Sequence, residues 1–360
     1  MGRIRNMLRR YRGRNLIDLH RFYYPVLTSN LSYNMRSIIS CLILFIASVQ
    51  LAAQERREIF FADPTIYVNE GKYYLTGTKG GGDSLGFSIL ESTDLKTWTL
   101  PAGTRDSTHM ILKKGNQNYG SVGFWAPQIF RGQGLYYLTY TANEQTVLAQ
   151  SRSVLGPYTQ KQAAPIDGSE KNIDSYIFKD DDGKHYLYHV RFDKGNYLWV
   201  AEFDLKKGKI KPETLKKCFN QTEPWEATPA YKSAPIMEGP TVLKLKDKYY
   251  LFYSANHFEN IDYSVGYAVS DSPYGPWVKQ KDSPIIHRSV VGENGAGHGD
   301  FFEGLDGQLY YVYHVHFDKD QVSPRRTRIV AVTKQLDTET GLYKFTSSGN
   351  GVIVPELTQK

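Results

Sequence analysis

The chain has 360 residues, of which 41% are hydrophobic and 22% are charged, a balance that supports a folded core and excludes a disordered protein. Its 27 Tyr and 31 Gly favour strands and turns over helical bundles. Residues 1–53 contain eight Arg, no Lys and one acidic residue, so they account for the whole net charge of +7. The rest of the chain is electrically balanced, and we therefore expect no nucleic-acid partner.

The first segment of the chain has the parts of an export signal. Arg36 precedes an apolar run over residues 37–49, and Leu51-Ala52-Ala53 supplies small residues for cleavage after Ala53. The alternative is a membrane anchor, but residues 37–53 number 17, fewer than the roughly 20 that cross a bilayer. We therefore predict export to the periplasm or the extracellular space, with no membrane span in the mature form.

Met35 stands directly before this signal and is the predicted start of translation, unless a long basic extension precedes it. The expected organisation is an extension with a signal peptide over residues 1–53 and one folded domain over residues 54–360. Cys41 falls inside the predicted signal, so Cys218 would be alone in the mature domain and no internal disulfide is expected.

One pattern recurs five times after the predicted signal. Each copy has an alternating strand, a turn such as Glu70-Gly71, and a second strand rich in tyrosine. The copies cover residues 60–78, 124–141, 173–190, 237–254 and 297–314. Their period of 48 to 65 residues is typical of a propeller, in which every blade is a four-stranded antiparallel sheet. We therefore predict an all-β, five-bladed β-propeller in preference to a long sandwich, which would not explain five copies.

The same phase of the five copies carries residues suited to chemistry. Taking Pro64, Pro127, Ser175, Pro240 and Asp300 as equivalent, the residues just before them are Asp63, Trp125, Asp174, Glu238 and His298. The first strand of a blade lies nearest the axis, so these side chains are expected to converge at one end of the channel. The alternative is that they are turn residues that cap strand starts.

Converging carboxylates suit the hydrolysis of glycosidic bonds. One carboxyl group protonates the leaving oxygen while another activates water, so their environments must push their pKa values apart. A third carboxylate helps, because like charges raise the pKa of a neighbour. Trp125 adds a flat apolar face on which a sugar ring can stack.

Four blocks resemble the hallmark motifs of glycoside hydrolase family 43, and the resemblance runs from about Ile59 to the end of the chain. The blocks are Ala62-Asp63-Pro64, Trp125-Ala126-Pro127, Ile173-Asp174 and Glu238-Gly239-Pro240. The resemblance implies that Asp63 is the general base, Glu238 the general acid, and Asp174 the residue that tunes the pKa of Glu238. It also implies inversion at the anomeric carbon, with the acid and base carboxyl groups roughly 6.5–9.5 Å apart.

The chain departs from the family pattern at two positions. Ser175 stands where the third block usually has proline, and Gln128 stands where an acid is common in the second block. His298 resembles a family histidine that faces an ion, often calcium, in the central channel, although a channel-lining hydrogen-bonding role is equally expected. No other cofactor is expected. Members commonly place an arginine against the innermost sugar, and Arg326 or Arg328 could take that role unless both are surface residues.

The resemblance implies a pentose substrate in arabinan, arabinoxylan or derived oligosaccharides. We favour α-L-arabinofuranosidase, since the sequence shows no C-terminal sandwich of the kind frequent in β-xylosidase members. The alternatives are β-xylosidase and endo-arabinanase. A non-catalytic sugar-binding propeller is a further alternative, but it gives no reason for three carboxylates in register. A third alternative is a fructan hydrolase on a similar propeller. Its nucleophilic aspartate would stand in a Trp-Asn-Asp-Pro motif, whereas Asp63 follows Phe61-Ala62.

Overall fold

The computed structural model describes residues 56–79, 86–104, 109–115, 117–229 and 235–358. The predicted signal peptide, the extension before it and Cys41 lie outside these residues. The chain divides into two units, Met1–Gln54 and Glu55–Lys360, and everything described belongs to the second. Within it, no helix is both long enough and apolar enough to cross a membrane.

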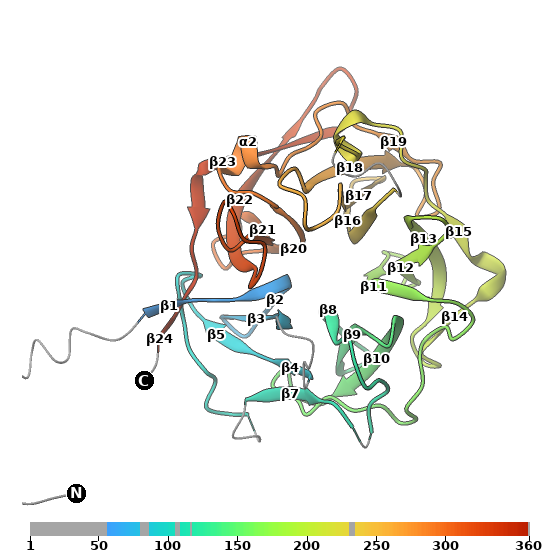
Figure 1. Cartoon of the computed structure of the whole chain (residues 1–360). Helices are drawn as coiled ribbons and strands as arrows, with labels where there is room; N and C mark the ends of the chain where they lie inside the picture. The colour runs from blue at the N-terminus through green and yellow to red at the C-terminus, as the bar shows by residue number, and fades with distance from the viewer. Residues whose placement is uncertain (1–55, 80–85, 105–108, 116, 230–234, 359–360) are drawn as a thin grey trace, which may run out of the picture. The chain divides into compact units, whose positions relative to one another are not determined.

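Five antiparallel sheets, blades I to V, follow one another around a central axis, and the first strand of each lies nearest that axis (Figure 1). Blade I consists of β2 (Phe61–Asn69), β3 (Lys72–Lys79) and β5 (Leu90–Ser92), and blade II of β8 (Trp125–Gly132), β9 (Leu135–Ala142) and β10 (Gln145–Ser151). Blade III consists of β11 (Asn172–Lys179), β12 (His185–Phe192), β13 (Asn196–Asp204) and β14 (Lys209–Ile210), with β15 (Lys216–Lys217) also paired to β13.

Blade IV consists of β16 (Met237–Leu245), β17 (Lys248–Ala255), β18 (Ser264–Ser270) and β19 (Val278–Lys279), and blade V of β20 (Gly297–Glu303), β21 (Leu309–Val315), β22 (Arg326–Leu336) and β23 (Tyr343–Ile353). Two smaller sheets contain β1 (Arg56–Glu58), β24 (Glu356–Thr358) and β6 (Thr97–Trp98), and β4 (Gly86–Ser88) with β7 (Met110–Lys113). The helical segments are η1 (Pro212–Thr214), η2 (Pro224–Glu226) and α2 (Arg288–Val291). The predicted five-bladed, all-β fold is confirmed.

Blades I and II differ from the expected four strands. Their fourth position is reduced to single bridges, from Glu91 to Thr99 and from Gln150 to Thr159. In an antiparallel ladder the hydrogen-bonding residues alternate, so the next donors would be two residues away. Pro101 and Pro157 stand at those positions on one side of each bridge and have no N–H to donate, so neither ladder can extend in that direction.

The ring is closed by strands from distant parts of the chain. β24 pairs antiparallel with β1 and parallel with β6, beside blade I. Thr327 of β22 donates its N–H to the carbonyl oxygen of Ile59, and its hydroxyl donates to that of Phe61. Blade V is thereby hydrogen-bonded to the residues that begin blade I.

The apolar core is divided among the five contacts between neighbouring blades. Each contact holds one cluster of buried side chains, and each cluster takes residues from both blades. Examples are Tyr74 with Leu138 (I and II), Tyr137 with Leu187 (II and III), Tyr188 with Leu251 (III and IV), Phe252 with Phe301 (IV and V) and Leu75 with Phe302 (V and I). The many tyrosines of the sequence therefore serve mainly as packing between blades.

The innermost strand of every blade is interrupted by a β-bulge at the same place. The first residue of each bulge has a positive φ, at Asp63 (47°), Ala126 (44°), Asp174 (55°), Gly239 (58°) and His298 (42°). These five are the true equivalents, which corrects the alignment made from the sequence. Gly299, and not Asp300, is the second residue of its bulge and corresponds to Pro64, Pro127 and Pro240. Asp63, Asp174 and His298 are the first residues of their bulges, whereas Trp125 and Glu238 each stand one residue before the bulge.

Candidate active site

The bulges surround a small cavity on the axis. It has a volume of about 30 Å³, too small for a sugar ring, and all five innermost strands line it. Asp300 lies in this lining and accepts hydrogen bonds from the hydroxyls of Thr65 and Thr241, both at 2.9 Å. Burial raises the pKa of Asp300 to about 6, in spite of those two donors. This carboxyl group therefore links blades I, IV and V at the axis.

Asp63 is buried among hydrogen-bond donors and cations. The hydroxyl of Thr78 donates to Oδ2 at 2.7 Å, and Nη1 of Arg325 donates to Oδ1 at 3.1 Å. Nδ1 of His298 lies 3.4 Å from the same Oδ1. Burial acts to raise the pKa of Asp63, but Arg325, His298 and the other partners outweigh it and hold the pKa well below its usual range. Asp63 is therefore an ionised acceptor at neutral pH.

Asp174 is buried in the opposite electrostatic environment. Burial raises its pKa to about 7, and the carboxylates of Glu238 and Asp63 add to the increase while His298 opposes it. Its Oδ2 accepts the backbone N–H of Gly239 at 3.4 Å and lies 4.0 Å from Nδ1 of His298. The two aspartates that approach Nδ1 of the same imidazole therefore have pKa values shifted in opposite directions.

Glu238 is held by two side chains that sequence reasoning missed. The hydroxyl of Tyr263, a fully buried residue, donates to Oε1 at 2.9 Å, and Nδ2 of Asn196 donates to Oε2 at 3.4 Å. Asn196 begins β13 of blade III, and Tyr263 directly precedes β18 of blade IV. Neither residue stands in a bulge, so the repeat that reveals the carboxylates carries no signal for them.

A repeated backbone hydrogen bond sets the positions of the bulges. In four blades the N–H of the first bulge residue donates to a side chain on the second strand of the preceding blade. These pairs are Asp63 with His314 (3.1 Å), Ala126 with Thr78 (2.9 Å), Asp174 with Thr141 (3.0 Å) and His298 with Ser254 (2.8 Å). The register places Val190 at the equivalent position of blade III. Valine offers no acceptor, so the N–H of Gly239 in blade IV bonds to Asp174 instead.

His298 joins the two aspartates and depends on the glycine beside it. A Cβ at Gly239 would lie 2.7 Å from Cδ2 of His298, so the imidazole occupies the space that a side chain would fill. Burial alone would lower the pKa of His298, but Asp63, Asp174 and Glu238 raise it. The sequence predicted that His298 faces the channel, and the geometry agrees.

The residues present do not suit the expected calcium ion. Calcium prefers several oxygen ligands. Among the described residues no group of three or more His, Cys, Asp or Glu side chains is arranged to hold a metal. The calcium ion stays a prediction, and no step is assigned to it.

Arg325, and neither Arg326 nor Arg328, is the arginine that contacts Asp63. Its guanidinium also lies 4.6 Å from the ring centre of Phe258. Arg326 and Arg328 face the other way, and both bind Glu293 at 2.8 Å. Side chains alternate along a strand, so Arg325 shares its direction with Thr327, which contacts blade I. Arg326 and Arg328 share a face, as predicted from alternation, and a contact of either with the innermost sugar stays a prediction.

Trp125 is the first residue of β8, directly before the bulge, and 40% of its surface is exposed. The two departures from the family pattern have structural explanations. Gln128 accepts the N–H of Ile177 at 2.7 Å and donates to its carbonyl oxygen at 3.3 Å, which a carboxylate could not do. The hydroxyl of Ser175 lies 2.5 Å from that of Thr139, so it ties blade III to blade II.

Gly239→Ala should displace His298 from the two aspartates. We expect the pKa of His298 to fall, because the ring would leave the carboxylates that raise it. Gly71→Ala is the matched control, since Gly71 also has a positive φ but nothing lies within 4 Å of a Cβ there. Both changes should cost about 1–2 kcal/mol of stability from backbone strain. NMR titration, with His298→Gln to assign the resonance, measures the shift, and an unchanged pKa in Gly239→Ala would contradict this packing.

Comparison with known proteins identifies the family. The Glycosyl hydrolases family 43 profile matches residues 58–337. The chain is 26% identical over 303 residues to a β-D-galactofuranosidase of Aspergillus niger, covering 78% of this chain and 81% of that protein. It is 27% identical to a putative β-xylosidase of Escherichia coli over 71% of this chain but 47% of that protein, so it spans about half the length of this relative.

Solved structures agree in fold and in sequence. An endo-1,4-β-xylanase from Bacteroides thetaiotaomicron has a TM-score of 0.75 and 38% identity, covering 85% of this chain and 99% of that one. A thermostable family-43 glycoside hydrolase has a TM-score of 0.69 and 31% identity, covering 79% and 92%. The buried carboxylates and these matches lead to one conclusion. The chain belongs to glycosyl hydrolase family 43 and is a glycoside hydrolase.

Proposed function

We propose that Asp63 is the general base and Glu238 the general acid of an inverting hydrolysis. The observation that carries this proposal is the opposite environments of the buried carboxyl groups. Asp63 is kept ionised, whereas burial and the nearby carboxylates of Glu238 and Asp63 raise the pKa of Asp174 and favour a proton on that carboxyl group. Such a division of proton affinity is what acid and base roles require at one pH.

In the proposed reaction Asp63 takes a proton from water as the water oxygen forms a bond to the anomeric carbon. The bond from that carbon to the glycosidic oxygen breaks, and Glu238 gives its proton to the leaving oxygen. Tyr263 and Asn196 orient Glu238 through its two oxygens. Asp174 is proposed to act as the partner of Glu238, because the two carboxyl groups are close enough for the charge of Glu238 to raise the pKa of Asp174.

The proposed substrate is a pentose linkage in a plant polysaccharide or oligosaccharide, with α-L-arabinofuranosyl as the first candidate. Relatives are named xylosidase/arabinosidase, and another is named for galactofuranose, which like arabinofuranose is a five-membered ring. The second candidate is a β-xylosyl linkage, supported by relatives named β-xylosidase and endo-1,4-β-xylanase. The exposed ring of Trp125 would stack on the sugar. Such polymers lie outside the cell, in agreement with the predicted export.

Asp63→Asn and Glu238→Gln should each reduce hydrolysis of arabinoxylan oligosaccharides at least about 100-fold, the usual contribution of a general acid or base. On nitrophenyl glycosides Glu238→Gln should lose much less, because a nitrophenolate leaves without protonation, whereas Asp63→Asn should lose as much as before. Asp306→Asn in an exposed turn is the control. Full activity in both variants would refute the roles, and sugar binding without hydrolysis by the unaltered protein would favour a binding propeller.

Product analysis by NMR on arabinoxylan oligosaccharides decides the substrate and the stereochemistry. We expect arabinose to appear first as the anomer opposite to the one in the substrate, because water attacks from the side of Asp63. Xylose as the first product would replace the first candidate with the second. Release of the retained anomer would contradict the proposed mechanism for either sugar.

The pH profile tests the coupling of Asp174 to Glu238. We expect kcat/KM to fall as the pH rises through about 7, when the pair loses its proton. Asp174→Asn removes the carboxyl group whose pKa is raised to about 7, together with its negative charge, so the alkaline limb should move to lower pH. Measurement of kcat/KM from pH 4 to pH 10 follows the limb.

Val190→Thr should move the alkaline limb of the kcat/KM profile to higher pH. The new hydroxyl would accept the N–H of Gly239, and Asp174 would lose a donor that lowers its pKa. Val190→Ala offers no acceptor and is the control that should leave the limb in place. Identical limbs in all of these variants would show that Asp174 does not govern the proton of the acid.

A further inference from the structure

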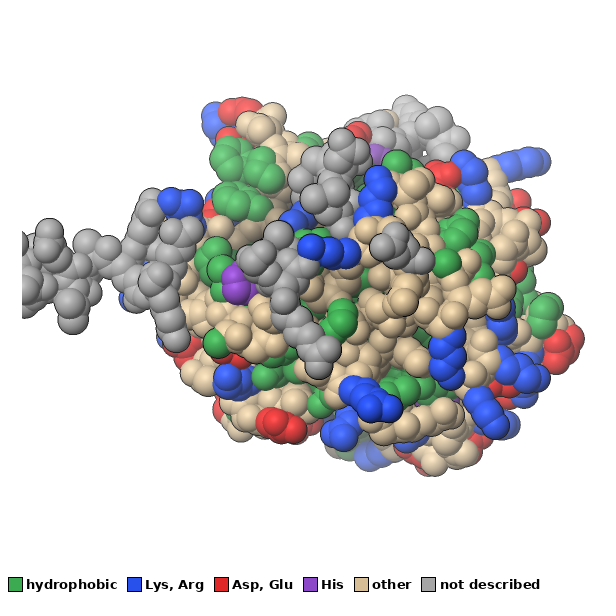
Figure 2. All heavy atoms as spheres, turned by 90° about the horizontal axis from the view of Figure 1, so that it is seen from below, with side chains coloured by type: hydrophobic (Ala, Val, Ile, Leu, Met, Phe, Trp, Pro, Cys, Tyr) green, Lys and Arg blue, Asp and Glu red, His purple; other side chains and the backbone are tan. Residues whose placement is uncertain are grey.

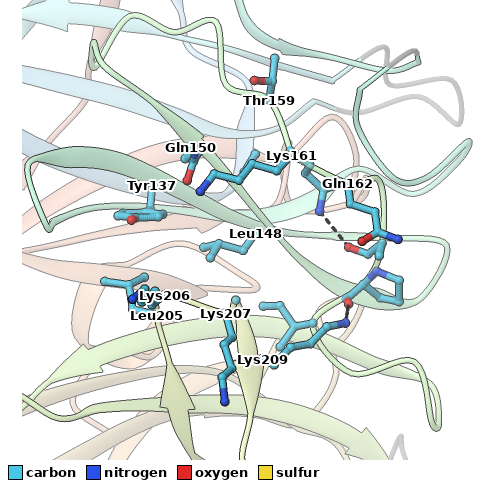
Figure 3. A pocket seen from close by; sticks show the side chains of 16 residues that line it. Tyr137, Leu148, Gln150, Thr159, Lys161, Gln162, Leu205, Lys206, Lys207 and Lys209 are labelled. Atoms are coloured by element: carbon cyan, nitrogen blue, oxygen red, sulfur yellow. Dashed lines mark hydrogen bonds between the residues drawn. The ribbon is translucent and has the colours of Figure 1, made fainter.

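A second cavity lies away from the carboxylates, between the outer parts of blades II and III. It has a volume of about 220 Å³. Its walls are β9 and β10, the segment over residues 159–166, and the β13–β14 turn over residues 205–209 (Figure 3). None of these residues lines the axial cavity.

The length of β13 separates this cavity from the active site. Asn196 at the start of β13 contacts Glu238, whereas the turn that lines the cavity follows Asp204 at its end. Eight steps of about 3.3 Å make this strand about 26 Å long. A sugar bound by Glu238 therefore does not reach the cavity, and any ligand there is a separate molecule or a distant part of a polymer.

The lining is strongly basic. Four lysines belong to it, Lys161, Lys206, Lys207 and Lys209, and no Asp or Glu does. Lys209 donates to the carbonyl oxygen of Pro165 at 2.6 Å, and Lys207 points away from the opposite wall (Figure 3). Lys161 and Lys206 come from opposite walls, and neither has an ion pair with a described residue. On the face seen from below, Lys and Arg side chains stand at several places in the lower and right-hand parts, with some acidic side chains between them (Figure 2).

The other lining groups fit a sugar. Tyr137, Leu148 and Leu205 give the cavity an apolar floor, on which a pyranose ring can pack. Gln150 and Gln162 contribute side-chain amides, which both donate to and accept from hydroxyl groups (Figure 3). An apolar floor, amides and uncompensated ammonium groups together match a ring that carries hydroxyls and a carboxylate.

We propose that this cavity binds a hexuronic acid residue of an acidic oligosaccharide, with the carboxylate between Lys161 and Lys206. The anionic character of the ligand follows from the lysines alone. The choice of a glycan also rests on the proposed function, because a hydrolase of plant polysaccharides meets uronic acid side groups on the same polymers. The cavity would then hold the polymer while Asp63 and Glu238 act on another part of it.

The test is calorimetric titration with a xylo-oligosaccharide that carries one glucuronic acid, its carboxyl-reduced counterpart and an oligogalacturonate. The protein carries Glu238→Gln to prevent cleavage. We expect the acidic ligands to bind and the reduced one to bind at least about tenfold more weakly, the usual contribution of a charged hydrogen bond. Lys161→Gln/Lys206→Gln should weaken acidic binding to the same extent. Lys281→Gln/Lys334→Gln, which removes two exposed lysines elsewhere, should not.

Equal affinity of the acidic and reduced ligands, or equal binding by the two double variants, would overturn the proposal. Binding of oligogalacturonate but not of the glucuronic acid ligand would support the site and assign it to pectic chains. In otherwise unaltered protein, Lys161→Gln/Lys206→Gln should leave nitrophenyl pentoside hydrolysis unchanged. That assay depends on the active site alone, so failure of the proposed hydrolase function is distinguishable from failure of this cavity.

Discussion

The β-bulge in each innermost strand is the constraint on which the site depends. A regular strand turns successive side chains to opposite faces, so it could not hold a carboxylate on the axis and keep its neighbours packed between blades. A bulge adds a residue and redirects the chain, and the positive φ at Asp63, Asp174 and His298 aims these side chains at one another. Left-handed backbone is costly for such residues, but the N–H of each is fixed by a side chain of the preceding blade.

The buried charges are stable only as a group. Asp63, Asp174 and Glu238 are balanced by Arg325 and His298, and none of the five is exposed enough for water to neutralise its charge alone. The cations are not shared equally, since Arg325 donates to Asp63. The deficit of positive charge therefore falls on Asp174, whose pKa is raised to about 7, so that a bound proton can compensate for it.

The sequence was sufficient to predict the ring, because a tyrosine-rich hairpin returned five times at intervals of 48 to 65 residues. It was also sufficient to find the three carboxylates, which stand inside that repeat. The one-residue error at Trp125 and Glu238 arose because a bulge is not visible in a pattern of alternation. Arg325 was missed for a similar reason, since its direction depends on where β22 begins. Tyr263 and Asn196 come from loops and strand ends that share no pattern, so only the folded chain brings them to Glu238.

A ring of five similar blades tends to place similar residues at five equivalent positions, whereas acid–base catalysis needs groups with different proton affinities at those positions. The chain breaks the symmetry at specific residues. Ala126 and Gly239 remove the side chain from two of the five bulges, and the imidazole of His298 occupies the space at Gly239. Val190 removes the acceptor that the other blades provide, which leaves the N–H of Gly239 for Asp174. Small and apolar residues at repeated positions therefore shape the chemistry as much as the charged ones do, because they decide which partners the carboxylates can reach.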